Sequence, residues 1–359
     1  MTRTVAARAD DVVRNDLERV VERDEGLWKE LRGARLFITG GSGFVGKWLL
    51  ESLAHANHRL GLGARALVLS RDPEQFAARH PRLFAGRGIE WWRGDVRDFD
   101  PAPGAFTHAI HAATDVAEER TPLETFEVIV KGTSRVLDFC RERAIGPLLL
   151  VSSGAVYGKQ PPEMERIDES FAGAPATTAP ESAYGQGKRV AEWLSAANAA
   201  AAGPAVRIAR CFAFVGPYLP MNRHFAIGNF IADRAAGRTL EVKGDGTPLR
   251  SYLHAADLAR WLWTILLRGS PGSAYNVGSE EAICVGDLAR RIAALDGGGA
   301  EVRVAMAPAS EAKPARYIPS TRKARRELGL EPTLTLDESL SRTLAWARLQ
   351  HRTDIRRDT

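Results

Sequence analysis

Cysteine, long apolar runs and clustered basic residues are all scarce in this chain of 359 residues. Its three cysteines, Cys140, Cys211 and Cys284, lie far apart. That spacing fits neither a disulfide framework nor a metal site, so we expect a reducing cytoplasmic setting and no bound metal. The 49 basic and 44 acidic residues are mixed along the chain without a basic run. This pattern gives no indication of nucleic-acid binding.

No apolar segment is long enough to cross a bilayer. The most apolar window, residues 261–267, is bounded by Arg260 and Arg268. It is far shorter than a membrane span and is more typical of a helix buried in a soluble core. The first residues, MTRTVAARADDVV, lack the apolar centre of a signal peptide. We therefore expect no association with a membrane.

The sequence does contain a regular alternation of apolar strand patterns with amphipathic helix patterns. Strands are expected at 35–39, 66–70, 89–93, 107–111, 148–152 and 206–211, with helices at 47–56, from Pro73, at 121–143 and at 184–201. Such alternation predicts an α/β fold with a doubly wound parallel sheet. An amphipathic extension, residues 1–33, precedes the Rossmann unit at 34–211. Residues 212–347 are expected to form mainly a smaller substrate-binding domain, with some segments returning to the first, and 348–359 a polar disordered tail.

A glycine-rich turn follows the first strand. The segment GGSGFVGKW, residues 40–48, lies between an apolar strand and an amphipathic helix. Glycines there allow a pyrophosphate to approach backbone N–H groups and the positive end of a helix dipole. An ordinary strand-to-helix turn can contain the same residues, so this pattern alone does not distinguish a pyrophosphate site from such a turn.

A tyrosine and a lysine at Tyr184 and Lys188 predict a second functional cluster. At this spacing they lie one turn apart on the same helix face. An ammonium beside a phenol lowers the pKa of the phenol, which can then exchange a proton with an alcohol or a carbonyl near neutral pH. Ser152 and Ser153 end a strand earlier in the chain, and ligands bind at the carboxyl ends of parallel strands. Ser152 is expected to be structural.

Several ordered motifs together resemble the extended short-chain dehydrogenase/reductase family, the nucleotide-sugar epimerases and dehydratases. The resemblance covers about residues 36–346. Its motifs are TGGSGFVG at 39–46, RGDVRD at 93–98, HAIHAAT at 108–114, SSGAVYG at 152–158, YGQGK at 184–188, and the later segments FVGP at 214–217, GDGTPLRSY at 244–252 and YNVG at 275–278.

The resemblance implies roles for particular residues. Tyr184 would be the acid/base, Lys188 its partner and the anchor of the nicotinamide ribose, and Ser153 the hydroxyl that hydrogen-bonds the reacting oxygen of the sugar. Arg250 and Asn229 would bind the substrate diphosphate. Other residues implied to contact the cofactor are Gly40, Gly43, Phe44, Val45, Gly46, Asp95, Val96, Ala112 and Ala113.

The end of the second strand bears on the choice between NADP and NAD. Relatives that use NAD commonly have an acidic residue there to bind the ribose hydroxyls, whereas this chain has Ser70 followed by Arg71. An arginine pairs with a 2′-phosphate, which a carboxylate would repel. The sequence therefore favours NADP, with NAD as the alternative that Asp72 keeps open.

Two departures from the family pattern affect the predicted reaction. The 4,6-dehydratases have an Asp-Glu pair, and the UDP-glucuronate decarboxylases usually a glutamate, where this chain has Gly154 and Ala155. Those two residues cannot transfer a proton. The family's Asn and Tyr in its Asn-x-Tyr-Gly-Pro motif are Ala213 and Val215 here, which weakens any substrate assignment. The segment at 221–225 lies where the family selects its base and sugar, so we expect it to set substrate specificity.

The sequence thus favours a nucleotide-sugar epimerase or 4-ketoreductase that transfers hydride at a sugar carbon, C4, with Tyr184 as acid/base. A dehydratase or decarboxylase with an atypical acid, a reductase of acyclic substrates, and a non-catalytic sensor or scaffold that binds NAD(P) remain alternatives. Paired helices at 121–143 and 184–201 form a dimer interface in much of this family, so we expect a homodimer.

Overall fold

A seven-stranded parallel sheet forms the centre of the computed structural model, which describes residues 2–114, 120–201, 203–221, 225–307 and 313–355. Its strand order is β11-β6-β5-β4-β1-β2-β3. The strands are β1 (Arg35–Thr39), β2 (Arg65–Ser70), β3 (Ile89–Arg93), β4 (His108–His111), β5 (Leu148–Ser153), β6 (Val206–Cys211) and β11 (Ala274–Val277). The predicted doubly wound α/β fold is confirmed, since the order reverses between β1 and β4.

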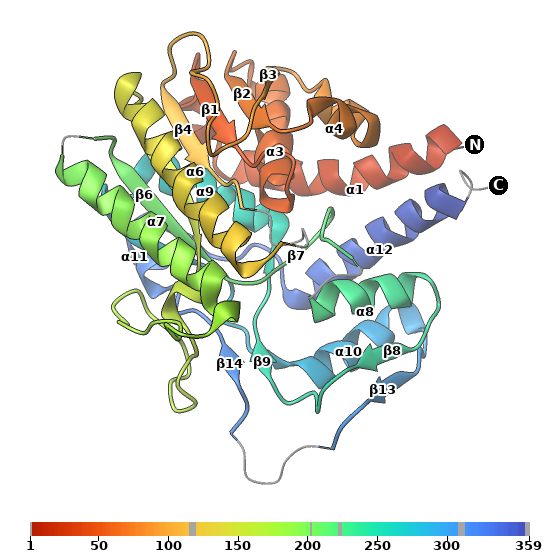
Figure 1. Cartoon of the computed structure of the whole chain (residues 1–359). Coiled ribbons are helices and arrows are strands. Elements are labelled where there is room, and N and C mark those ends of the chain that lie inside the picture. The colour runs from red at the N-terminus through yellow and green to blue at the C-terminus, as the bar shows by residue number, and fades with distance from the viewer. Residues whose placement is uncertain (1, 115–119, 202, 222–224, 308–312, 356–359) are drawn as a thin grey trace.

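Alternating side chains divide this sheet between two hydrophobic cores. In β1, Leu36 and Ile38 point to one face and Phe37 to the other. Helices α3 (Phe44–Leu60) and α9 (Ala255–Arg268) cover the first face, and α6 (Pro122–Glu142) and α7 (Ala183–Ala200) cover the second (Figure 1). Because both faces are covered, the strands read as nearly continuous apolar runs.

Segments beyond residue 211 complete this large unit. The apolar window at 261–267 lies in α9, which is buried against the sheet as predicted. Strand β11 pairs in parallel with β6 at the sheet edge. The chain therefore leaves the large unit after β6 and returns to it twice. Within the described residues, no helix combines the length and apolar character needed to cross a bilayer.

The N-terminal extension forms α1 (Thr2–Arg23) and α2 (Glu25–Lys29) and packs as an outer layer. Helix α1 lies against α3, α9 and the last helix, α12 (Leu336–Ile355), so that the two ends of the chain run side by side (Figure 1). Arg342 of α12 donates to the buried carboxylate of Asp16 at 2.6 Å. The extension therefore connects the large unit to the smaller one.

A smaller unit packs around α8 (Ala226–Ala235), α10 (Val285–Ala293) and the first part of α12. Short strands complete it in three small sheets. These strands are β7 (Phe214–Val215), β8 (Leu240–Val242), β9 (Leu249–Arg250), β10 (Leu253–His254), β12 (Ile283–Cys284), β13 (Val302–Val304) and β14 (Arg316–Tyr317). The remaining helices are α4 (Pro73–Arg79), α5 (Pro81–Phe84) and α11 (Arg322–Leu328), with short 3₁₀ turns at Gly154–Tyr157, Pro180–Ser182 and Leu295–Gly297.

The expected disordered tail at 348–359 is corrected by the structure. Helix α12 continues to Ile355, and residues 356–359 lie outside the described part of the chain. Leu340, Leu344 and Ala347 form an apolar stripe that packs into the smaller unit. Arg348 forms an ion pair with Asp296, so polar residues continue the helix on its outer face.

Candidate active site

A cavity of about 590 Å³ lies at the carboxyl edge of the parallel sheet. It is lined by the ends of β1, β2, β4, β5 and β6 because parallel strands all present their carboxyl ends at one edge. The structure brings together there nearly all of the residues singled out in the sequence. These are Gly40, Gly43, Phe44, Val45, Gly46, Ser70, Arg71, Asp95, Val96, Ala112, Ala113, Ser153, Tyr184, Lys188 and Arg250.

The glycine turn at the start of α3 requires residues without a side chain. Gly40 has a φ of +76°, and a Cβ there would lie 2.5 Å from the carbonyl carbon of Ala112. A Cβ on Gly46 would lie 2.2 Å from the carbonyl oxygen of Gly40. Gly43 is the N-cap of α3, and no side chain caps the helix there. The first-turn N–H groups and the positive end of the helix dipole therefore border the cavity, an arrangement that suits a pyrophosphate.

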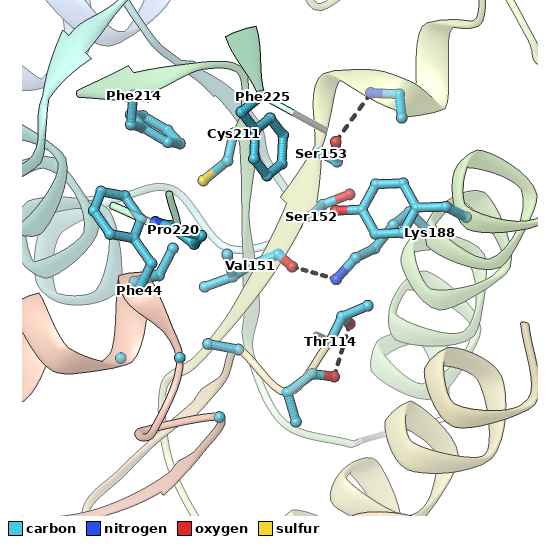
Figure 2. Close-up of a pocket in the computed structure, with 18 of the residues that line it drawn as sticks. Phe44, Thr114, Val151, Ser152, Ser153, Lys188, Cys211, Phe214, Pro220 and Phe225 are labelled. Carbon is cyan, nitrogen blue, oxygen red and sulfur yellow. Dashed lines mark hydrogen bonds between the residues drawn. The ribbon is translucent and has the colours of Figure 1, made fainter. Parts of the chain in front are cut away.

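Tyr184, Lys188 and Ser153 meet at the other end of the cavity. Helix α7 places Tyr184 and Lys188 one turn apart, and the Lys188 Nζ atom lies 5.9 Å from the centre of the Tyr184 ring. Lys188 donates a hydrogen bond from Nζ to the carbonyl of Val151 at 2.8 Å. Figure 2 shows Ser153 and Lys188 on one wall of the pocket, opposite the apolar side chains of Phe44, Phe214, Pro220 and Phe225.

The protonation behaviour of Tyr184 differs from the expectation. Burial raises the pKa of Tyr184 to about 12, and a hydrogen bond with Ser153 offsets part of the rise. Burial also lowers the pKa of Lys188 to about 8. Loss of hydration is the main cause of the raised pKa of the phenol, and Lys188 donates to the Val151 carbonyl.

A chain of hydrogen bonds fixes the turn that follows β4. Thr133 donates to the Ile129 carbonyl at 2.7 Å, so its oxygen accepts from His111 Nε2 at 3.1 Å. His111 Nδ1 then accepts from the Thr39 hydroxyl at 2.8 Å, and that oxygen accepts from the Ala113 amide at 3.3 Å. Burial lowers the pKa of His111 to about 3, which keeps the imidazole neutral. The cavity wall at Ala113 is thereby held in one position.

The opposite end of the cavity carries a basic side chain at the end of β2. Ser70 and Arg71 line the cavity there. Asp72 is committed elsewhere because its carboxylate caps α4 by accepting from the Gln75 amide at 2.9 Å. Asp95 also lines this end, and its hydrogen bonds with Arg97 hold the pKa of the carboxyl below its usual value.

Asn229 is the one predicted contact residue outside the cavity lining. It lies on α8, one turn beyond the start of the helix. Phe225, Ala226 and Ile227, at that start, line the cavity instead. The predicted role of Asn229 toward a diphosphate therefore has no support from its position, whereas Arg250 lines the cavity as expected. The segment expected to select the substrate falls partly on residues 222–224, which are outside the described part of the chain.

Three further side chains in the lining were not assigned from the sequence. Tyr317 comes from β14, Tyr252 from the loop before β10, and Cys211 from the end of β6. Cys211 is the direct strand neighbour of Ser153, a pairing that the alternation of strands and helices does not specify. No sequence pattern pointed to Tyr317, because its strand β14 has two residues and is too short to show an alternation of apolar and polar residues.

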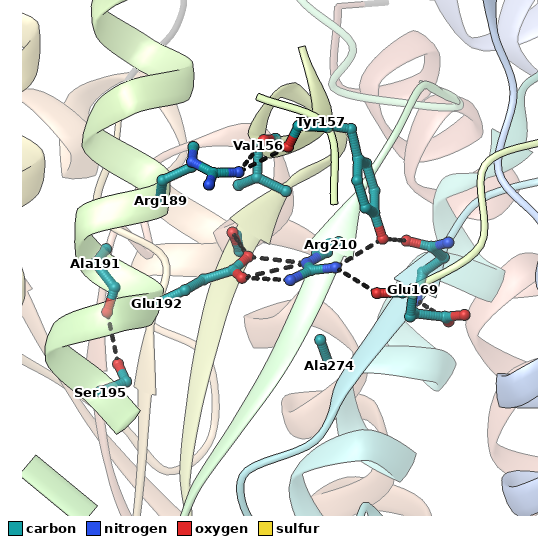
Figure 3. A network of polar contacts seen from close by, with 12 residues as sticks. Val156, Tyr157, Glu169, Arg189, Ala191, Glu192, Ser195, Arg210 and Ala274 are labelled. Atoms are coloured by element: carbon teal, nitrogen blue, oxygen red, sulfur yellow. Dashed lines mark hydrogen bonds and ion pairs between the residues drawn. The ribbon is translucent and has the colours of Figure 1, made fainter. Parts of the chain in front are cut away.

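A polar network beneath the cavity joins the strand ends on which it is built (Figure 3). Arg210 binds Glu192 of α7 at 2.7 Å and donates to the Tyr157 hydroxyl at 2.8 Å. Ser152 donates to Glu192 at 2.5 Å, which supports the structural role expected for Ser152. Tyr157 in turn donates to Asn276 at the end of β11 at 2.8 Å. The network therefore ties β5, β6 and β11 to α7, which carries the Tyr–Lys pair.

The described residues contain no group of three or more His, Cys, Asp or Glu side chains arranged to hold a metal ion. The three cysteines are free, and Cys140 and Cys211 are buried.

Comparison with known proteins places the chain in a family. Residues 36–278 match the model of the "NAD dependent epimerase/dehydratase family". The chain is 30% identical over 333 residues to UDP-glucuronic acid decarboxylase 1 of Xenopus tropicalis, which covers 88% of this chain and 73% of that protein.

Two solved structures are similar over almost their whole length. DesIV, a dTDP-glucose 4,6-dehydratase from Streptomyces venezuelae with NAD bound, is 25% identical with a TM-score of 0.69, covering 88% of this chain and 97% of that one. The epimerase Mth375 of Methanothermobacter thermautotrophicus is 24% identical with a TM-score of 0.73, covering 93% and 97%. The family resemblance seen in the sequence is confirmed: the chain belongs to the NAD dependent epimerase/dehydratase family.

Proposed function

We propose that this protein oxidises the C4 hydroxyl of a nucleoside diphosphate sugar by hydride transfer to a nicotinamide cofactor. The observation that carries the proposal is that Ser153, Tyr184 and the buried Lys188 line one cavity, with Lys188 Nζ 5.9 Å from the centre of the Tyr184 ring. Hydride leaves an alcohol carbon productively only if the hydroxyl proton is taken up at the same time. Tyr184 would take that proton in its ionised form, and Ser153 would hold the oxygen.

The cavity suits a dinucleotide along its length. Gly40, Gly43 and Gly46 would hold the pyrophosphate at the start of α3, where a Cβ on Gly40 or Gly46 would collide with backbone. Asp95 would lie at the adenosine end, and Lys188 would anchor the nicotinamide ribose. Bound there, the cofactor supplies the hydride acceptor.

Recognition of a 2′-phosphate is proposed for Arg71. Asp72, the carboxylate next to it, is occupied as the cap of α4, so it does not compete for the ribose. The guanidinium of Arg71 at the end of β2 has the charge and geometry to pair with a phosphate. This favours NADP over NAD, within a family whose description names NAD.

For the fate of the C4 ketone we propose decarboxylation of a nucleoside diphosphate uronic acid. The decarboxylase relative supports this over 88% of the chain. Among the described residues that line the cavity, Asp95 is the one carboxylate, and it lies at the adenosine end. Elimination of water needs a base at C5, whereas loss of CO₂ supplies its own electron pair to the ketone. The cavity therefore suits decarboxylation better than dehydration.

Epimerisation or one-way ketoreduction at C4 is the second candidate. Gly154 and Ala155 favour it, since both reactions need only a tyrosine, a lysine and a serine. An epimerase or ketoreductase is therefore the alternative function. The decarboxylase relative favours decarboxylation over both.

The test incubates the protein with UDP-glucuronic acid, UDP-glucose and dTDP-glucose, each with NADP or NAD, and follows products by NMR. A nucleotide pentose and CO₂ from the uronic acid are expected. A C4 epimer of a neutral sugar without CO₂ would favour the second candidate, and no product from any substrate would favour a non-catalytic scaffold.

A matched pair of variants tests the proposed role of Tyr184. Tyr184→Phe keeps the ring and deletes the proton carrier, so turnover should fall by about 10²–10⁴ while the fold survives. Tyr275→Phe is the control, because Tyr275 is also buried but lies outside the cavity lining. Near-normal turnover of Tyr184→Phe would mean that the proposed hydride transfer is wrong.

A further inference from the structure

The Tyr317 side chain lines the cavity, and its hydroxyl occupies space that is free because Gly154 has no side chain. Strand β14 pairs with β9, which sets Tyr317 beside Arg250. A Cβ built on Gly154 would lie 2.6 Å from the Tyr317 hydroxyl oxygen and 2.8 Å from the ring of Phe212. Any side chain at position 154, including the aspartate of the dehydratases, would displace this hydroxyl. The glycine and the tyrosine therefore form a complementary pair.

Ser153 lies in the cavity lining together with Tyr317 and Tyr184. The Ser153 hydroxyl oxygen accepts from the Ala155 amide at 3.1 Å. Ser153 lowers the pKa of each phenol, against the rise that burial causes. Tyr317 therefore lines the same cavity as Tyr184 and Ser153.

Several contacts hold the Tyr317 segment in place. The ring of Tyr317 packs on Phe212 with 4.7 Å between centroids. The next residue, Ile318, donates its amide to Gln160 at 2.9 Å and accepts from the Ile167 amide at 2.9 Å. Asn276 of the polar network donates to the Ser320 carbonyl at 3.1 Å. The phenol is thus fixed on both sides by the framework that positions Ser152 and α7.

We propose that Tyr317 is a second catalytic phenol, the acid that protonates C5 of the sugar after CO₂ has left. The assignment rests on the proposed decarboxylation. The C5–C6 bond of the 4-keto uronic acid breaks, and its electron pair forms a C4–C5 double bond with the charge on O4. C5 then takes the proton of the Tyr317 hydroxyl, the C4 ketone re-forms, and the Tyr317 phenolate regains a proton from water. No oxidant is consumed in this step.

Two other ionisable groups in the cavity lining have roles of their own. Tyr184 is assigned to the C4 oxygen by the proposed function, and Lys188 donates to Val151. Burial raises the pKa of Tyr317, so its hydroxyl keeps its proton at neutral pH until the more basic C5 carbon of the enolate takes it.

The test uses the full chain, UDP-glucuronic acid and the preferred cofactor in D₂O. Tyr317→Phe should still oxidise C4, so reduced cofactor and the 4-keto sugar accumulate, while pentose formation falls about 10²-fold. The deuteron at C5 should lose its single configuration because water then protonates from either side. Tyr275→Phe, a buried phenol outside the cavity lining, is the control and should match the wild type.

Gly154→Ala provides a second arm that leaves Tyr317 in the sequence. Its methyl group should displace the Tyr317 hydroxyl and give the same block after C4 oxidation, and the double variant should lose little more than either single one. Gly26→Ala is its control, because a Cβ there meets nothing within 4 Å.

The outcomes separate the two claims. A wild-type chain that leaves the uronic acid unchanged would overturn the proposed function, and the assignment of Tyr317 with it. Wild-type decarboxylation combined with an unchanged pentose rate and a single C5 configuration in Tyr317→Phe would overturn the assignment alone. If Tyr317→Phe does not fold, the same comparison is read from Gly154→Ala.

Discussion

Lys188 should make the fold less stable at neutral pH than at alkaline pH. Its side chain is 4% exposed, and the single hydrogen bond assigned to its Nζ goes to the Val151 carbonyl. Burial lowers its pKa from 10.5 to about 8. An ammonium kept in this position costs free energy of folding that a neutral amine does not cost.

The size and the pH range of this cost follow from the pKa shift. A shift from 10.5 to about 8 corresponds to about 3 kcal/mol at roughly 1.4 kcal/mol per pKa unit. Between pH 8 and 10.5 the unfolded chain binds the proton and the folded chain does not, so stability rises with pH there. The full cost is present below about pH 8 and is gone above 10.5.

Lys188→Met removes the charge while keeping an unbranched side chain. The variant escapes the ionisation cost but leaves the Val151 carbonyl without its donor, which costs about 1–3 kcal/mol. The two effects nearly offset at pH 7. On going from pH 7 to pH 9 the wild type should gain about 1 kcal/mol relative to Lys188→Met, since the folded lysine loses its proton in this range.

Urea unfolding followed by tryptophan fluorescence at both pH values measures this difference. Lys131→Met on α6 is the control, because Lys131 is exposed and pairs with Glu127 on the same helix. Its difference from the wild type should not change between the two pH values. A difference between the wild type and Lys188→Met that also stays constant would refute the claim that Lys188 is desolvated. Lys188→Met should lose turnover as well. The charge of Lys188 would then lower the stability of the fold while supporting the proposed reaction.

Three further outcomes are expected. Gly46→Ala should abolish cofactor binding in calorimetry and lower the melting temperature, because its Cβ would lie 2.2 Å from the Gly40 carbonyl oxygen; unchanged binding would show that the turn is not the pyrophosphate site. Arg71→Ala should weaken NADP binding about tenfold to a hundredfold and spare NAD, and equal losses would mean that Arg71 does not contact a 2′-phosphate. Sedimentation should give the mass of a homodimer, because α6 and α7 expose the apolar side chains of Leu123 (82%) and Trp193 (67%). The double variant Leu123→Glu with Trp193→Glu should give the mass of a monomer. A wild-type monomer at micromolar concentration would contradict the expected dimer.

Local patterns predicted the large unit because its elements repeat. Strands such as Leu148–Ser153 are continuous apolar runs, and the N-cap Thr121 with Glu124 forms a capping box that starts α6. The smaller unit was less predictable, since its sheets are built from strands of two or three residues that pair across distant segments. The extent of α12 was underestimated because polar residues dominate its last turns and its helical contacts are tertiary.

In the candidate site, the motif residues were predictable and their energetics were not. Gly40, Ser153 and Tyr184 line one cavity because their strand and helix ends meet at one sheet edge. The pKa of Tyr184 was expected to be lowered, whereas the structure raises it, since spacing along a helix says nothing about hydration. Asn229 was placed by position in a motif, but the exact start of α8 decides which residues face the cavity.

Gly154 shows why a missing side chain in a motif does not by itself exclude a chemistry. From the sequence, the lack of an acid at positions 154 and 155 argues against decarboxylation, because a side chain that is absent cannot transfer a proton. In the structure the same lack of a side chain is what admits the Tyr317 hydroxyl, 2.6 Å from where a Cβ of Gly154 would be. A substitution at one position is therefore interpretable only together with the residue that fills the space. If Gly154→Ala and Tyr317→Phe block the same step, the glycine is as much a part of the catalytic design as the phenol that it admits.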